Sequence, residues 1–129
     1  MINPSILNDL LQKAIDNNIE TIFIHTLSGG ILCMKGEKVH QTILDILPSM
    51  WIEYYQVEDS SLSDEKLNYL LVENENFNIL SSNLYGYLIT VIAKKTMKLG
   101  MLKFHLENIV NVLNDVFKPY KDVLLAKNN

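Results

Sequence analysis

The most informative shortage in this sequence is that of cysteine. The 129 residues include a single cysteine, Cys33, so no internal disulfide can form. Small secreted domains usually depend on disulfides, whereas isolated thiols are typical of a reducing compartment. The sequence therefore excludes a disulfide scaffold and predicts a fold that is held together by a hydrophobic core.

A block of basic residues and a long apolar run are also missing. The formal net charge is −4, and the 11 basic residues are dispersed along the chain. Nucleic acid is therefore not expected as a partner. The longest clean apolar run, residues 87–93, is much shorter than the roughly 20 residues that a helix needs to cross a bilayer. We expect no direct insertion into a membrane, so attachment to one would need a partner.

Side chains suited to catalysis or metal binding are few. The histidines are far apart in the chain, at His25, His40 and His105. They are expected to be buried or half-buried structural residues rather than ligands or bases, and Cys33 a buried small hydrophobe rather than a nucleophile. The acidic stretch at 58–65 lacks the glycine and the ligand spacing of a calcium loop. The sequence predicts no enzyme activity, no metal and no cofactor.

Hydrophobic periodicity predicts one domain, residues 1–118, followed by a polar tail at 119–129. Strands occur in blocks of two and three with few long crossovers, which favours antiparallel pairing. We predict an α+β fold of order α-β-β-α-β-β-β-α, with helices on both faces of a five-stranded, mostly antiparallel sheet. The predicted helices span 4–15, 38–56 and 101–117, and the predicted strands span 20–25, 31–35, 66–73, 77–82 and 84–94.

The helix predicted at 38–56 has more apolar side chains than one sheet can cover. At about 100° per residue, one arc should pack on the chain's own sheet, and it contains Val39, Ile43, Ile46, Leu47, Met50 and Tyr54. A second ridge lies beside this arc. Because Trp and Tyr are enriched at interface centres, we predict that Leu44, Trp51 and Tyr55 of this ridge contact another protein. The alternative is a core that wraps around the helix.

Pro48 lies inside the same helix and removes one backbone hydrogen bond, at a cost of about 3 kcal/mol in a helix interior. It either kinks the helix or begins a second short helix.

The strand predicted at 66–73 is apolar on both faces and is expected at a sheet edge. An apolar edge strand tends to aggregate unless another strand pairs with it or covers it. We therefore predict that this strand pairs with a partner strand. The predicted contact residues in it are Leu67, Asn68, Tyr69, Leu70, Leu71 and Val72.

Three stretches carry a resemblance to a known family. The most specific is AKKTMKLGMLKFHLENIVNVL at 93–113, and Trp51 with Tyr54 forms a Trp-x-x-Tyr on the second helix. DEKLNYLLVENE at 64–75 has an acidic residue ahead of its apolar strand. On these residues the chain resembles the Roadblock/LC7 family, and within it the Roadblock subunits of Ragulator. Pro48 and the tail after Pro119 depart from the family pattern. The matching positions in the first stretch are Ala93, Lys94, Thr96, Gly100, Met101, Leu102 and Lys103.

The resemblance implies a non-catalytic scaffold that forms a heterodimer with a sister Roadblock subunit. In such dimers the third strands pair into one sheet and the second helices pack side by side. The resemblance also implies an assembly on the cytoplasmic face of the late endosome or lysosome, held there by a lipidated subunit. That assembly docks Rag GTPases for TOR signalling and MAP kinase components.

Two rival functions stay open at this point. The first is a homodimeric Roadblock protein that regulates a small GTPase or acts as a dynein light chain. The second is a small-molecule sensor, against which stands the lack of polar residues converging on an apolar pocket.

Overall fold

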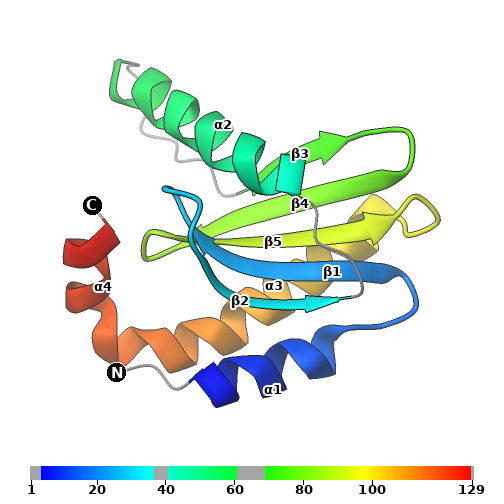
Figure 1. Cartoon of the computed structure of the whole chain (residues 1–129), viewed down its shortest axis with the longest axis horizontal. Coiled ribbons are helices and arrows are strands. Elements are labelled where there is room, and N and C mark those ends of the chain that lie inside the picture. Colours follow the sequence, from blue (N-terminus) through cyan, green and yellow to red (C-terminus); the bar gives the residue numbers. More distant parts are fainter. Residues whose placement is uncertain (1–3, 37–40, 61–68, 129) are drawn as a thin grey trace.

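The computed structural model of the chain describes residues 4–36, 41–60 and 69–128. The elements follow the predicted order, with two short helices added at the C-terminal end (Figure 1). The helices are α1 (Pro4–Ala14), α2 (Gln41–Ser60), α3 (Leu99–Phe117) and α4 (Lys121–Asn128), with a 3₁₀ turn at Lys118–Tyr120 before α4. The strands are β1 (Ile19–Thr26), β2 (Ile31–Gly36), β3 (Tyr69–Glu73), β4 (Phe77–Leu84) and β5 (Tyr87–Lys94).

The five strands form one sheet in the order β2-β1-β5-β4-β3, and each neighbouring pair is antiparallel. This confirms the predicted α+β architecture. Strand β5 lies at the centre of the sheet, and its residues 87–93 are all buried. A strand that is covered on both faces needs apolar side chains on both, which explains the uninterrupted run in its sequence.

Helices cover both faces of the sheet, as predicted (Figure 1). Helices α1 and α3 pack on one face and form with it the larger cluster, in which Leu7, Leu11, Leu106 and Leu113 are fully buried. Helix α2 packs on the other face, where helix and sheet together form a smaller cluster. The buried members of this smaller cluster are Phe23, Leu44, Leu47, Ile79 and Ile92.

The turn between α1 and β1 is fixed by Asp16. Its Oδ1 accepts hydrogen bonds from the backbone N–H groups of Asn18, at 2.7 Å, and Ile19, at 3.1 Å. Such side-chain-to-backbone bonds compete with helix continuation. The helix therefore ends and the chain enters the sheet.

The segment after Pro119, expected as a polar tail, contains helix α4. Leu124 of this helix is fully buried in the larger cluster. Nearby, Lys121 lies over the ring of Tyr85, with Nζ 5.9 Å from the ring centroid. Helix α4 thus packs against the rest of the fold beside the β4–β5 turn.

Candidate interaction edge at strand β3

Strand β3 lies at one edge of the sheet, as the sequence predicted. Within the described ranges it pairs only with β4, from Tyr69 opposite Ser82 to Glu73 opposite Asn78. The described strand begins at Tyr69, so the predicted contact residues Leu67 and Asn68 lie outside the described residues. Among the residues that the structure describes, no strand pairs with the other side of β3, so that side can accept another strand.

The turn after β3 shows which backbone groups point to the free side. The N–H of Asn74 donates to the carbonyl oxygen of Phe77 at 3.0 Å. In an antiparallel ladder, hydrogen-bonded pairs alternate with non-hydrogen-bonded pairs. The pair of Asn74 and Phe77 is hydrogen-bonded, so every second residue back along β3 is too. The backbone groups of Val72 and Leu70 therefore bond to β4. Residues 69, 71 and 73 therefore direct their N–H and C=O groups away from the sheet.

The side chains of β3 alternate between the two faces. Leu70 and Val72 pack against the smaller cluster beneath α2. Tyr69 and Leu71 point to the α3 face, where they line a hollow of about 240 Å³ that we call the β3–α3 hollow. Its other lining residues are Leu80, Leu99, Leu102 and Lys103.

The β3–α3 hollow is apolar and open to solvent at the sheet edge. Leu71 is 41% exposed and Leu99 is 43% exposed. Two large aliphatic side chains that flank one hollow beside a free strand edge form an apolar patch of the kind that marks an interaction site. The hollow and the free backbone groups of β3 therefore belong to one surface.

One end of this surface carries a cation and a phenol. Lys103 lies over the ring of Tyr69, with Nζ 5.3 Å from the centroid, and 3.9 Å from Oε1 of Glu107. The hydroxyl of Tyr69 donates to the same carboxylate at 3.2 Å. Partial burial, together with the hydrogen bond and the negative charge of Glu107, raises the pKa of Tyr69. Tyr69 is therefore a neutral hydrogen-bond donor at neutral pH.

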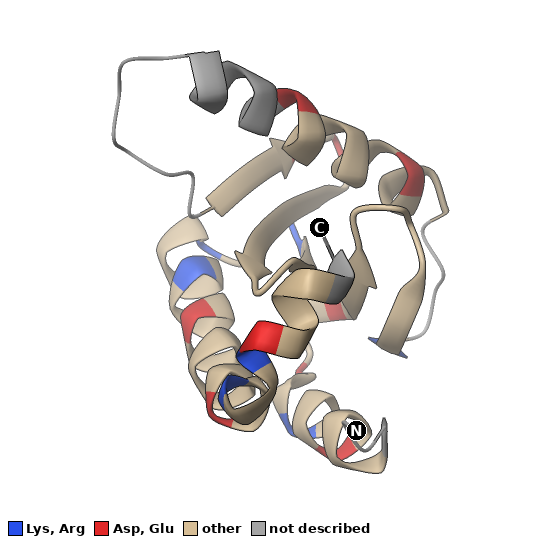
Figure 2. Ribbon diagram, turned by 90° about the vertical axis from the view of Figure 1, so that its left-hand side faces the viewer, with Lys and Arg blue, Asp and Glu red and all other residues tan. Residues whose placement is uncertain are grey.

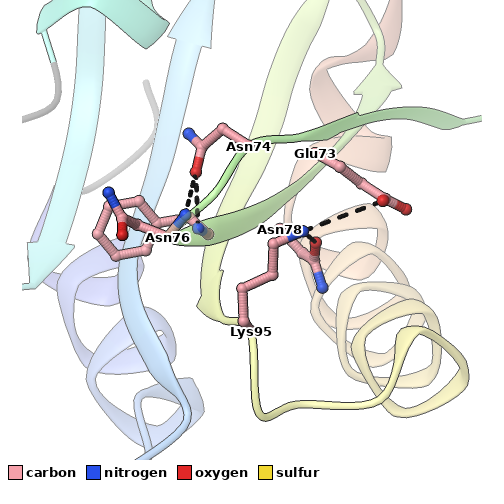
Figure 3. A network of polar contacts seen from close by, with 6 residues as sticks. Glu73, Asn74, Asn76, Asn78 and Lys95 are labelled. Carbon is pink, nitrogen blue, oxygen red and sulfur yellow. Dashed lines mark hydrogen bonds and ion pairs between the residues drawn. The ribbon is translucent and has the colours of Figure 1, made fainter.

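The opposite end of β3 carries an acid. Lys95 connects Glu73, 4.0 Å away, with the buried side chain of Asn78, whose Oδ1 accepts a hydrogen bond at 2.8 Å (Figure 3). The Glu73 and Lys95 side chains are 52% and 38% exposed, so their ion pair contributes little to stability. Its effect is to hold the Glu73 carboxylate at the end of the edge strand.

The turn between β3 and β4 is fixed by Asn74. Its Oδ1 accepts hydrogen bonds from the backbone N–H groups of Asn76, at 2.8 Å, and Phe77, at 2.7 Å (Figure 3). Asn side chains commonly close turns in this way. The register of β3 on β4, and with it the choice of outward residues, is thus specified locally.

No family model matches the chain. Solved structures match it at low sequence identity. A Roadblock/LC7 domain from Streptomyces avermitilis is 11% identical, with a TM-score of 0.72 over 88% of this chain and 95% of that one. The chain has the Roadblock/LC7 fold. The gliding protein MglB from Thermus thermophilus is 12% identical, with a TM-score of 0.73 over 86% of this chain and 87% of that one. An MglB with a tetrameric arrangement is 13% identical, with a TM-score of 0.72 over the same shares.

Helix α2 of this Roadblock/LC7 fold corrects one prediction. Leu44 is 2% exposed and Trp51 is fully buried, so the prediction that these two side chains face another protein is wrong. Trp51 Nε1 donates to Ser81 Oγ on β4 at 3.1 Å. Between residues 41 and 53, the part of the helix whose side chains are described, the buried positions are Leu44, Leu47, Pro48 and Trp51. The side chain of Tyr55 lies outside the described residues.

Of the arc predicted to pack on the sheet, Leu47 is buried as predicted, but the positions beside it face solvent or lie half-buried. Ile46 is 49% exposed, and Ile43 and Met50 beside it are half-buried. On the other flank Ile52 is 41% exposed. The sequence therefore indicated correctly that α2 has more apolar side chains than its sheet covers. It placed Leu44 and Trp51 on the exposed side and Ile46 on the buried side, and the structure reverses both. Helix α2 continues through Pro48, so this proline does not begin a second helix.

A buried polar chain runs beneath α2. From Trp51 it passes through Ser81 and Thr90, whose hydroxyls are 2.9 Å apart, to His25, whose Nε2 is 2.7 Å from Thr90 Oγ1. All four residues are fully buried. Burial lowers the pKa of His25 to about 4. His25 is thus a neutral structural residue.

The other candidate chemical groups are also engaged in the fold. Nε2 of half-buried His105 lies 2.6 Å from the carbonyl oxygen of Ala14, and burial raises the pKa of Cys33. His40 lies outside the described residues. Within the described ranges, no three His, Cys, Asp or Glu side chains gather as metal ligands, and no helix is long and apolar enough to cross a membrane.

Sequence reasoning missed Leu99, Lys103 and Glu107 as parts of the edge surface. They lie in the first half of α3, which is distant in sequence from β3. Figure 2 shows that this helix carries both basic and acidic residues. Leu99 precedes the predicted start of the helix at 101. No local signal in the sequence brings these residues to the strand.

Proposed function

We propose that this chain is a non-catalytic adaptor that acts by pairing with another Roadblock-type chain through β3. The observation that carries the proposal is the free edge of β3, where residues 69, 71 and 73 direct backbone groups outward beside an apolar hollow. Adding a strand to such an edge satisfies these groups and buries the apolar patch. The ridge of α2 formed by exposed Ile46 with half-buried Ile43 and Met50 offers further apolar surface to the same partner.

In its most specific form, the proposal is that the chain heterodimerises with a sister Roadblock subunit in a Ragulator-like complex. A lipidated anchor subunit would hold that complex on the cytoplasmic face of the late endosome or lysosome. There it would help to dock Rag GTPases for TOR pathway activation and MAP kinase components. The family-like residues at 93–113 and 64–75 support this form.

The second candidate is a homodimeric Roadblock protein that regulates a small GTPase or acts as a dynein light chain. The structural similarity to MglB, one structure of which has a tetrameric arrangement, favours assembly with further Roadblock-type chains.

Two proline variants test the pairing itself. Proline has no N–H to donate, and Leu71 directs its N–H to the free side while Leu70 bonds to Ser81 of β4. Leu71→Pro should leave the isolated chain folded and abolish partner binding. Leu70→Pro should instead lower the free energy of unfolding by about 1–3 kcal/mol, because its ladder bond is lost. Hydrogen exchange of the β3 amides, measured with and without partner, gives the same comparison without substitution.

Copurification decides between the two candidates. The tagged chain, isolated from cells of its source, should bring down a second Roadblock-type protein together with a lipidated protein and Rag GTPases. Mass measurement of the complex then gives its stoichiometry. Recovery of the chain only as pairs of itself with a small GTPase would reject the Ragulator-like form. A chain that keeps its partner when Leu71 is replaced by proline would reject pairing through β3 altogether.

A further inference from the structure

The start of α3 carries the two most exposed large apolar side chains among the residues that the structure describes. Phe104 is 58% exposed and Met101 is 55% exposed. Residues three apart on a helix are neighbours, so these two side chains lie together, turned away from the buried Leu102 and Leu106. Neither of them lines the β3–α3 hollow. The proposed pairing through β3 therefore gives this apolar pair no role.

Lysines flank the apolar pair. Residues 94–106 contain four lysines, all of them exposed, and no Asp or Glu, although the whole chain has a formal net charge of −4. Lys98 directly precedes α3, whose first turn has no acidic residue, and Lys103 is the neighbour of Phe104 on the helix. This end of the helix thus combines apolar side chains with positive charge in an acidic chain.

The acids nearest to these lysines hold them only weakly. Lys103 lies 3.9 Å from Glu107, and Lys95 lies 4.0 Å from Glu73. All four side chains are more than a third exposed, and ion pairs between such side chains are weak and screened by salt. A lysine can therefore turn from either carboxylate to another anion at little cost.

We propose that the surface formed by Lys98, Met101, Lys103 and Phe104, which we call the α3 lysine surface, rests on an anionic lipid bilayer. Binding of this kind needs apolar side chains that enter the boundary between headgroups and acyl chains, and cations that stay among the phosphates. Lysine suits the second role, because its stem extends along apolar surface while the ammonium group stays in water. The chain would lie on the membrane without crossing it.

The shape of the α3 lysine surface favours a bilayer over a protein. Met101 and Phe104 protrude from the convex side of a helix, and neither lines the groove between α1 and α3. A protein that covered them would need a matching pocket for each side chain. The headgroup region of a bilayer instead deforms around a protruding side chain, and its negative charge complements the lysines.

The expected contact is weak and reversible. Each lysine close to an anionic membrane surface strengthens binding about fivefold, and stable attachment takes a second signal such as a lipid chain. The α3 lysine surface would therefore orient on the membrane a chain that another subunit anchors there. This inference goes beyond the proposed pairing through β3 and does not depend on it.

Cosedimentation with vesicles tests the surface. The full chain should bind phosphatidylcholine vesicles that contain phosphatidylserine at least about tenfold more tightly than pure phosphatidylcholine vesicles, and added salt should release it. Lys98→Glu should weaken binding at least about tenfold, and Phe104→Ser at least about fivefold, because apolar burial is lost. Val112→Ser is the matched control. Val112 is 44% exposed on the same helix but lies beyond residues 94–106, so this variant should bind normally.

A tryptophan at position 104 reports entry into the lipid directly. The chain has one tryptophan, so Phe104→Trp combined with Trp51→Phe leaves a single reporter. Its emission should shift to shorter wavelength and be quenched by brominated lipid when vesicles that contain phosphatidylserine are added. Val112→Trp in the same background is the control and should show neither change. Circular dichroism confirms that each variant is folded.

Each contrary result overturns a stated part of the inference. Absence of binding to both kinds of vesicle at low salt overturns membrane contact, whereas the proposed pairing through β3 would stand. Equal binding to the two lipid compositions overturns the role of the lysines. Normal binding by Phe104→Ser, or equal loss in Val112→Ser, overturns the location. Capture of an acidic protein that Phe104→Ser abolishes, without vesicle binding, overturns the bilayer as the occupant.

Discussion

The two faces of the sheet are built differently. On the α1 and α3 face the larger cluster is apolar throughout and extends from Leu7 in α1 to Leu124 in α4. On the α2 face the smaller cluster shares the interior with the polar chain from Trp51 to His25. Apolar burial stabilises a fold in proportion to its area, so the first face supplies most of the stability. The second face holds its helix with fewer apolar contacts and with directional hydrogen bonds.

The largest expected effect comes from truncating the larger cluster. Leu106→Ala should lower the free energy of unfolding by about 3–4 kcal/mol, because helices and strands on all sides prevent the cavity from collapsing. The equally buried Leu47→Ala on α2 should cost about 2 kcal/mol, since α2 can settle toward the sheet. Urea unfolding of both variants measures the difference. Equal or reversed losses would show that the two faces contribute alike.

Acid should destabilise the α2 face through His25. Its pKa is lowered from 6.5 to about 4 in the folded chain, chiefly by burial. The unfolded chain therefore binds the proton first, and stability that is full above pH 6.5 is lost as pH falls toward 4. This group alone should account for about 3 kcal/mol.

The measurement for this prediction is the free energy of unfolding from pH 7 to pH 4. His25→Leu serves as the control, because it removes the titrating group while carboxylates continue to contribute. A pH dependence that is the same with and without His25 would contradict the assignment.

The hydrogen bond at the α2 end of the polar chain should have a moderate effect. Trp51→Phe keeps an aromatic ring in place but removes the donor to Ser81 Oγ. The loss should be about 1 kcal/mol, and the affinity for a β3 partner should be unchanged because the ring is buried within the chain. If the variant has normal stability but binds the partner weakly, Trp51 contacts the partner and is not a buried residue of this chain.

The smallest effect on stability is expected for exposed residues on the two faces. Ile46 on α2 and Ile6 on α1 are 49% and 47% exposed, so Ile46→Ser and Ile6→Ser should each change the free energy of unfolding by less than about 0.5 kcal/mol. Only Ile46→Ser should weaken the dimer, because α2 lies on the proposed partner surface. Equal loss of affinity in both variants would show that the α1 face also takes part.

The elements of this fold were readable from the sequence because their signals are local. The apolar run of 84–94, the β-branched and aromatic residues at 20–25 and the helical spacing near 101–117 each match an observed element. The grouping of the predicted strands into blocks of two and three also predicted the antiparallel sheet correctly, and the predicted helices lie on both of its faces. Even the edge position of β3 followed from its short hairpin with β4.

The orientation of α2 could not be read in the same way. Two apolar ridges lie side by side on this helix, and periodicity gives their angle but not which of them faces the sheet. Tertiary structure decided this, because β4 presents the hydroxyl of Ser81 as a partner for the indole N–H of Trp51. A buried indole N–H needs such an acceptor, so the ridge that appeared suited to another protein packs inside the chain.

The sequence by itself thus determined the fold class, the strand blocks and the presence of an apolar edge, since these depend on residues close together in the chain. Only the tertiary structure decided which face of α2 is buried and that α3 adds Leu99 and Lys103 to the edge of β3. The physical reason is that both results depend on contacts between distant segments. Such contacts are selected by complementary shape and hydrogen bonding once the elements pack, and periodicity within one segment carries no record of them.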